Sequence, residues 1–136
     1  MGSPAHDVAA IHAVLRLIEQ SVRTRDYEAV RPIVPDDSVS FGSYADLVVG
    51  YEQMRERQFQ QVWPRIEDFT IDPDSIHIGI RGDLGWVACT FDSYVQGPNG
   101  ERLRRLGRMT LVLERRAGRW VQVHSHTSLA PGGRLY

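Results

Sequence analysis

The sequence predicts an α+β fold in which helices come first and then pack on one face of a curved antiparallel sheet. Two observations support this prediction. Up to Pro64 the apolar residues recur every three or four positions, as in helices, whereas after Pro64 they alternate, as in strands. The strand-like stretches are separated by short segments that contain glycine, which is typical of antiparallel hairpins.

Three helices are expected in the first half of the chain. The first covers residues 6–25, where charged residues lie between the apolar positions and Asp7 is a candidate N-cap. The second is short, covers residues 26–34 and ends at Pro35, because proline has no amide hydrogen to continue the helix. The third follows Gly50, carries an apolar stripe up to Trp63 and ends at Pro64.

The strands are expected mostly in the second half. A short strand at residues 39–41 precedes the third helix. Four long strands then cover residues 69–80, 85–96, 103–116 and 119–129. Because the connections between the four are short, we expect each strand to pair with the next one along the chain.

Length and composition indicate one globular domain over residues 1–136. The chain has 42% hydrophobic and 24% charged residues, close to the globular average. Sixteen basic and seventeen acidic residues give a net charge of -1, which does not favour nucleic acid or an anionic membrane as a partner. No transmembrane or signal segment is apparent, so we expect a cytoplasmic protein. The single cysteine, Cys89, is expected in the core.

Alternation divides the strand at residues 85–96 into two faces. We take the face that carries Trp86, Thr90, Asp92 and Tyr94 as the inner one. Asp92 is then a candidate general base, because a poorly hydrated pocket raises the pKa of a carboxyl group. Tyr94 is a candidate hydrogen-bond donor to a developing enolate. The alternative is that Asp92 only bonds neighbouring hydroxyl groups or water.

Two histidines, His124 and His126, share one face of the last strand and would supply two ligands to a metal ion. No third ligand is apparent, and Arg108 on the preceding strand would repel a cation. We therefore expect packing or hydrogen bonding for both histidines, and no metal. The chain also has no GxSxG, GxGxxG, phosphate-loop or HExxH motif, so no cofactor is expected.

The C-terminal stretch carries a family resemblance. Residues 110–131 contain the pattern WxxxHxHxSxAP from Trp120 to Pro131, which resembles the end of the association, or hub, domain of calcium/calmodulin-dependent protein kinase II. The likeness continues upstream through residues 46–50, Trp63 and residues 76–78. This group lies in the nuclear transport factor 2-like superfamily, with the ketosteroid isomerases and SnoaL-like cyclases. The resemblance implies three helices over a strongly bent sheet, a cone with an internal pocket, and dimers.

The resemblance also implies which side chains line the pocket. On the last strand it places Val123, Ser125 and Thr127 inside, and Trp120, His124 and His126 outside. The cavity arginines of the kinase hub correspond here to Thr90, Leu111 and Thr127, none of which is arginine. A pocket histidine of the hub corresponds to Arg55 or to Met54.

Two hypotheses of function follow. The first is a pocket for a hydrophobic small molecule, either a binding site or the site of an isomerase, cyclase or lyase, with Asp92 and Tyr94 as catalytic residues. Its ligand-binding residues are Met54, Arg55, Phe59, Trp63, Trp86, Thr90, Leu111, Ser125 and Thr127. The second is a non-catalytic oligomerisation module that forms a homodimer or larger assembly through the outer sheet face. That face is expected to present Val87, Phe91, Val112 and Trp120, with both histidines nearby.

Overall fold

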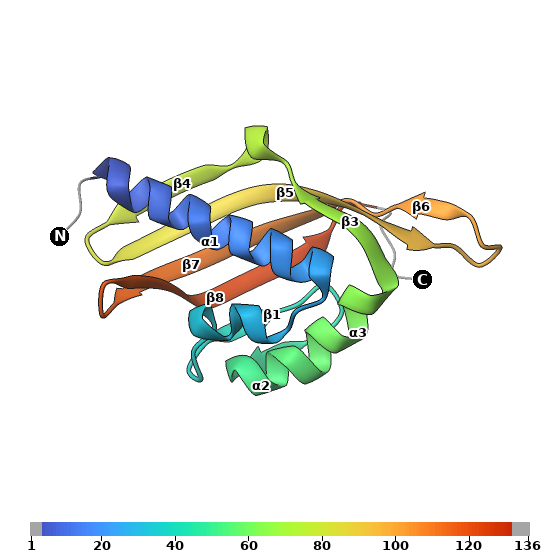
Figure 1. The fold of residues 1–136 in the computed structure, drawn as a ribbon, viewed down its shortest axis with the longest axis horizontal. Coiled ribbons are helices and arrows are strands. Elements are labelled where there is room, and N and C mark those ends of the chain that lie inside the picture. The colour runs from blue at the N-terminus through green and yellow to red at the C-terminus, as the bar shows by residue number, and fades with distance from the viewer. Residues whose placement is uncertain (1–3, 132–136) are drawn as a thin grey trace.

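The computed structural model describes residues 4–131. One long helix, α1 (Pro4–Thr24), lies along one face of an eight-stranded sheet, and the shorter helical segments continue the same layer (Figure 1). The apolar side of α1 buries Ile11, Val14, Leu15 and Val22, which recur at helical spacing and enter the main core. The fold is therefore α+β with the helices gathered on one face of a curved sheet.

The other predicted helices take different forms. Residues 26–34 contain a short 3-10 helix, Glu28–Ile33, rather than an α-helix. The segment after Gly50 is composite: α2 (Gly50–Met54), a π-helical turn (Arg55–Phe59) and α3 (Gln60–Val62) run on without a break. A 3-10 turn, Trp63–Arg65, ends this segment at Pro64.

The sheet is mixed rather than purely antiparallel. Its order is β2-β1-β8-β7-β5-β3, and β4 and β6 also pair with β5. The strands are β1 (Val39–Phe41), β2 (Leu47–Val49), β3 (Ile66–Ile71), β4 (His77–Arg81), β5 (Leu84–Gln96), β6 (Arg102–Arg104), β7 (Gly107–Arg116) and β8 (Arg119–Leu129). The antiparallel prediction is wrong for β1, which pairs with β8 in parallel. These two strands are far apart in sequence, so no hairpin fixes their direction.

Two of the long predicted strands are interrupted. The stretch 69–80 divides into the end of β3, a 3-10 turn at Pro73–Ser75, and β4. The stretch 103–116 divides into β6 and β7, with Arg105 and Leu106 between them. The register across this gap is continuous, because Arg105 exchanges two backbone hydrogen bonds with Ser93 of β5. Arg105 therefore keeps the side-chain direction of a strand residue.

A β-bulge in β8 changes which side chains point inward. Val112 pairs with His124, but the next residue, Leu113, pairs with Gln122, so Val123 is the extra residue. Strict alternation, which the sequence analysis assumed, fails at this point. Trp120 consequently points to the core with 5% of its surface exposed, and the prediction that it lies on the outer face is wrong.

The predicted inner face of β5 is also wrong. Val87, Cys89 and Phe91 lie in the core beneath the helices, whereas Trp86 lies on the opposite face and is 49% exposed. The physical reason is amphipathicity: the face with the more continuous apolar surface is the one buried against the helices. Val87 and Phe91 therefore do not belong to the outer surface. Among the described residues, no helix is both long and apolar enough to cross a membrane.

Candidate functional site

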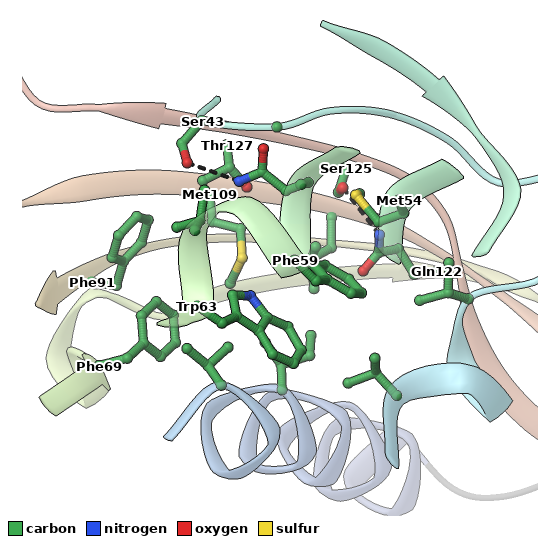
Figure 2. Close-up of a pocket in the computed structure, with 18 of the residues that line it drawn as sticks. Ser43, Met54, Phe59, Trp63, Phe69, Phe91, Met109, Gln122, Ser125 and Thr127 are labelled. Atoms are coloured by element: carbon green, nitrogen blue, oxygen red, sulfur yellow. Dashed lines mark hydrogen bonds between the residues drawn. The ribbon is translucent and has the colours of Figure 1, made fainter. Parts of the chain in front are cut away.

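A cavity of about 90 Å³ lies between the helices and the inner face of the sheet (Figure 2). Its helical wall comes from α1, the 3-10 helix and the α2–α3 segment. Its sheet wall comes from the inner residues of β3, β5, β7 and β8 and from the loop after β1. The lining is mostly apolar, and its polar members are Ser43, Gln58, Arg105, Gln122, Ser125 and Thr127.

The apolar part of the cavity includes an aromatic wall. The rings of Phe59 and Trp63 stack with centroids 4.3 Å apart, and Tyr27 stacks on Trp63 at 5.4 Å. Phe69 and Phe91 meet at 5.0 Å next to them, as Figure 2 shows. Flat rings of this kind present large apolar surface to a ligand with little loss of side-chain freedom.

One polar cluster consists of Ser43, Gln58 and Arg105. The π-helical turn carries Gln58, whose Oε1 accepts from the backbone N–H groups of Tyr44 (3.0 Å) and Ala45 (2.7 Å). Its Nε2 donates to Ser43 Oγ at 2.9 Å. The Ser43 hydroxyl also accepts from Arg105 Nη2 at 2.9 Å. Gln58 therefore holds the loop after β1 against the cavity and places Ser43 beside the guanidinium.

Arg105 is the largest fully buried side chain of the cavity wall. Only 2% of its surface is exposed, and Nη1 is 3.5 Å from Ser93 Oγ. Its Nε has no hydrogen-bond partner within residues 4–131. Burial lowers the pKa of Arg105 to about 10, so the side chain is still charged at neutral pH.

A second polar cluster lies on β8. Gln122 Nε2 donates to Ser125 Oγ at 3.0 Å, and the Ser125 hydroxyl donates to Ser40 Oγ of β1 at 2.8 Å. The bulge at Val123 brings Gln122 to this face beside Ser125. The cluster supplies amide and hydroxyl groups to the cavity wall.

The cavity gathers part of the predicted site. Six of the predicted ligand-binding residues line it, and their role in binding stays a prediction: Met54, Phe59, Trp63, Leu111, Ser125 and Thr127. Arg55 is not in the lining and pairs with Glu52 at 2.7 Å. Trp86 and Thr90 point from the outer face of β5, so their expected place in the pocket is wrong.

The two predicted catalytic residues also lie on the outer face of β5. Asp92 Oδ2 is 2.7 Å from Arg104 Nη2, and the guanidinium of Arg102 lies 3.5 Å from the centre of the Tyr94 ring. Their inward placement is wrong for the same reason as that of Trp86. A catalytic role for Asp92 and Tyr94 remains an untested prediction.

The two histidines of β8 face outward, as the resemblance implied. His124 Nδ1 lies 2.7 Å from the backbone oxygen of Val39, and the ring of His126 lies 5.1 Å from that of Phe41. Within the described part of the chain, no group of three His, Cys, Asp or Glu side chains is placed to hold a metal ion.

Arg105 and Gln58 were missed by the sequence analysis for different reasons. Alternation in the stretch 103–116 puts Arg105 on the same face as Leu103, Met109 and Leu111, so that signal was present. The neighbouring Arg102, Arg104 and Arg108 mask this signal, because a run of arginines is typical of a solvated surface. Gln58 faces inward because of the π-helical turn, and a helical period of 3.6 gives no sign of such a turn.

Comparisons with known proteins agree on the fold. The family model of the SnoaL-like domain matches residues 11–131. No curated protein matches the chain. A ketosteroid isomerase-like protein from Erwinia carotovora atroseptica is similar in structure, with a TM-score of 0.75, 20% identity, and coverage of 89% of this chain and 94% of that one.

Two further solved structures are similar. The association domain of CaMKII from C. elegans has a TM-score of 0.69 and 21% identity, and the match covers 91% of this chain and 95% of that one. A protein of unknown function with a cystatin-like fold from Nostoc punctiforme has a TM-score of 0.80 and 15% identity, with full coverage of both chains. At these identities the likeness establishes the fold alone.

Proposed function

Because the chain belongs to the SnoaL-like domain family of the nuclear transport factor 2-like superfamily, we propose that it binds a small, largely apolar molecule. The proposed binding site is the cavity between the helices and the inner face of the curved sheet. The observation that carries the proposal is an internal cavity with an aromatic wall and two separate polar clusters. This make-up, apolar surface with a few placed polar groups, is the usual one for small-molecule sites.

The same cavity has groups that would serve an isomerase, cyclase or lyase. Arg105 and Gln122 are hydrogen-bond donors, and donors held in place stabilise negative charge that develops on a substrate oxygen. The polar lining residues within residues 4–131 are hydroxyl, amide and guanidinium groups. These groups bind and orient a ligand without changing protonation state near neutral pH. Binding is therefore the primary proposal, and turnover is an extension of it.

Thermal-shift screening of apolar metabolites, followed by Trp63 fluorescence, tests the proposal. To isolate Trp63, we would replace Trp86 and Trp120 with Phe. Thr127→Leu fills the cavity and is expected to abolish the ligand response, whereas Thr110→Leu, on the outer face of β7, leaves it intact. Equal responses of the two variants would contradict the proposed site.

A second candidate function is self-association through the outer face of the sheet. We define the outer patch as the exposed apolar residues Val39, Phe41, Leu47, Val49 and Trp86. Strand pairing places Val39 between Val49 and His124, and Val112 between His124 and Trp86. The patch residues therefore lie on one face of β2, β1 and β5, with His124 of β8 and Val112 of β7 between them. A monomer that exposes such a surface is unusual, and a two-fold dimer is the commonest way to cover it.

Light scattering after size exclusion tests this second proposal. The wild-type chain is expected to be a dimer at micromolar concentration. Trp86→Glu is expected to give a monomer, because it places charge in the patch, whereas Val8→Glu on the exposed side of α1 leaves the dimer intact. A wild-type monomer under these conditions would contradict self-association.

A further inference from the structure

We propose that the ligand of this cavity carries a carboxylate group and that Arg105 binds it. The inference rests on the proposed function and adds the chemical class of the ligand. It starts from the fact that Arg105 is a buried cation in a cavity wall whose charge the described chain does not balance. Arg105 occupies a different position from Thr90, Leu111 and Thr127, the residues that correspond here to the cavity arginines of the kinase hub.

The hydrogen-bond inventory of Arg105 is incomplete. A guanidinium has five N–H donors, and two of them have acceptors here, the hydroxyl groups of Ser43 and Ser93. The contact with Ser93 is long, at 3.5 Å, and Nε has no partner in the described residues. Both acceptors are neutral. A buried donor without an acceptor is costly, so this edge of the guanidinium is poised for a ligand oxygen.

The charge of Arg105 is also unbalanced. Within residues 4–131, Arg105 takes part in no salt bridge, and none of the cavity-lining residues is Asp or Glu. The surroundings instead include Phe91, whose ring centre lies 6.0 Å from the guanidinium carbon, and Met109. A buried charge in such apolar surroundings destabilises the protein unless an opposite charge accompanies it. A ligand anion would remove this destabilisation on binding.

The composition of the site favours a carboxylate. A planar guanidinium matches a planar carboxylate through two parallel hydrogen bonds, and one arginine balances one negative charge. Ser43 adds a hydroxyl beside it, held in place by Gln58. The aromatic wall from Phe91 to Trp63 would take the apolar remainder of the molecule. We therefore expect a small monocarboxylic acid with an apolar body.

Two matched ligand pairs test the inference: phenylacetate with phenylacetamide, and hexanoate with hexanamide. Each pair has the same apolar body and differs in charge at about pH 7. Isothermal titration of the wild-type chain is expected to give at least about tenfold tighter binding of each acid than of its amide, the gain of one charge-assisted contact. Equal binding of acid and amide would overturn the inference and leave the proposed pocket intact.

Variants assign the preference to Arg105. Arg105→Met is expected to reduce the acid-to-amide ratio to about one while amide binding persists. Arg104→Met is the matched control, because Arg104 is the adjacent arginine but is exposed and pairs with Asp92. It is expected to keep the wild-type ratio. A ratio that survives Arg105→Met would overturn the assignment.

Two further results keep the test decisive. If Arg105→Met does not fold, the wild-type ratio still decides the ligand class, and Ser43→Ala, which removes one neighbour of the guanidinium, is expected to lower acid binding several-fold more than amide binding. If neither member of either pair binds to folded wild-type chain, and the metabolite screen is also negative, the proposed function itself is contradicted and the inference falls with it.

Discussion

Arg105 lies just before the start of β7 and Arg115 near its end, and both point toward the helix-covered side of the sheet. Arg115 is 14% exposed and has two carboxylate partners, Asp7 Oδ1 at 2.6 Å from Nη1 and Asp83 Oδ1 at 3.0 Å from Nε. Its guanidinium also lies 4.8 Å from the centre of the Trp120 ring. Arg105, which is more deeply buried, has only serine hydroxyl groups.

The difference is visible in the direction of the two pKa shifts. The hydrogen bond with Asp83, followed by the charge of Asp7, raises the pKa of Arg115, whereas burial alone lowers the pKa of Arg105 to about 10. The chain thus supplies the counter-charge at one end of β7 and supplies none among residues 4–131 at the other. A buried arginine whose charge is balanced by carboxylates of its own chain has a structural role. A buried arginine beside a cavity whose charge is not balanced indicates a binding site.

The largest effect is expected at the end of β7 where Arg115 has its carboxylate partners. Asp7→Ala leaves the guanidinium of Arg115 without its buried partner and detaches the start of α1 from β7. We expect the thermal midpoint to fall by on the order of 10 °C. Asp83→Asn is the control and should lower it by far less, because Asp83 is largely exposed. A small effect of Asp7→Ala in a melting experiment would remove the contrast between the two arginines.

An intermediate effect is expected at Gln58, which holds Ser43 beside Arg105. Gln58→Ala removes the acceptor of two backbone N–H groups and the donor to Ser43. We expect a loss of about 2 kcal/mol in the free energy of unfolding, measured by urea denaturation, together with weaker phenylacetate binding. Gln61→Ala is the matched control, since its amide only donates to a carbonyl of its own helical segment, and it should cost well under 1 kcal/mol. Equal losses for the two variants would contradict a supporting role.

A smaller effect is expected at Arg105 itself. Without ligand, Arg105→Met should leave the free energy of unfolding within about 1 kcal/mol of wild type, or raise it, because an apolar side chain replaces an unbalanced buried charge. Urea denaturation measures this difference. A large loss of stability would mean that the guanidinium holds the fold together, as Arg115 does.

The smallest effect is expected at Asp92. Asp92→Asn weakens an exposed pair with Arg104 on the outer face, so phenylacetate affinity should change by no more than about twofold. Titration calorimetry measures it. Loss of binding in this variant would contradict the cavity as the binding site and would favour the face of β5 that carries Asp92.

The sequence was sufficient for the helix-first order and for most of the strands, but it missed β2 and did not settle all of the faces. Strand β1 and the strand at 119–129 match their predicted bounds, because alternation and glycine-containing turns are local signals. Alternation also separated the two sides of β5, but it does not say which side is buried. The side with Asp92 and two aromatic residues was taken as the inner one. The other side, with Val87, Cys89 and Phe91, is more apolar and is the one that is buried.

The remaining errors come from single-residue irregularities. The extra residue at Val123 reverses the facing of Trp120 relative to Ser125, and no residue type in β8 marks that position. The pairing of β1 with β8 depends on contacts between distant parts of the chain. Ser125 and Thr127 were placed on the cavity side by family resemblance, where alternation alone left both faces open.

The π-helical turn at Arg55–Phe59 also bears on how this pocket changes in evolution. A π-turn accommodates one residue more than an α-helical turn, and each residue of an α-helix advances the next by about 100°. Deletion of a single codon here would restore the regular helix and rotate Phe59, Val62 and Trp63 together relative to the cavity. One small deletion would thus exchange a whole wall of the site and leave the sheet untouched, a route to new ligands that point substitutions do not offer.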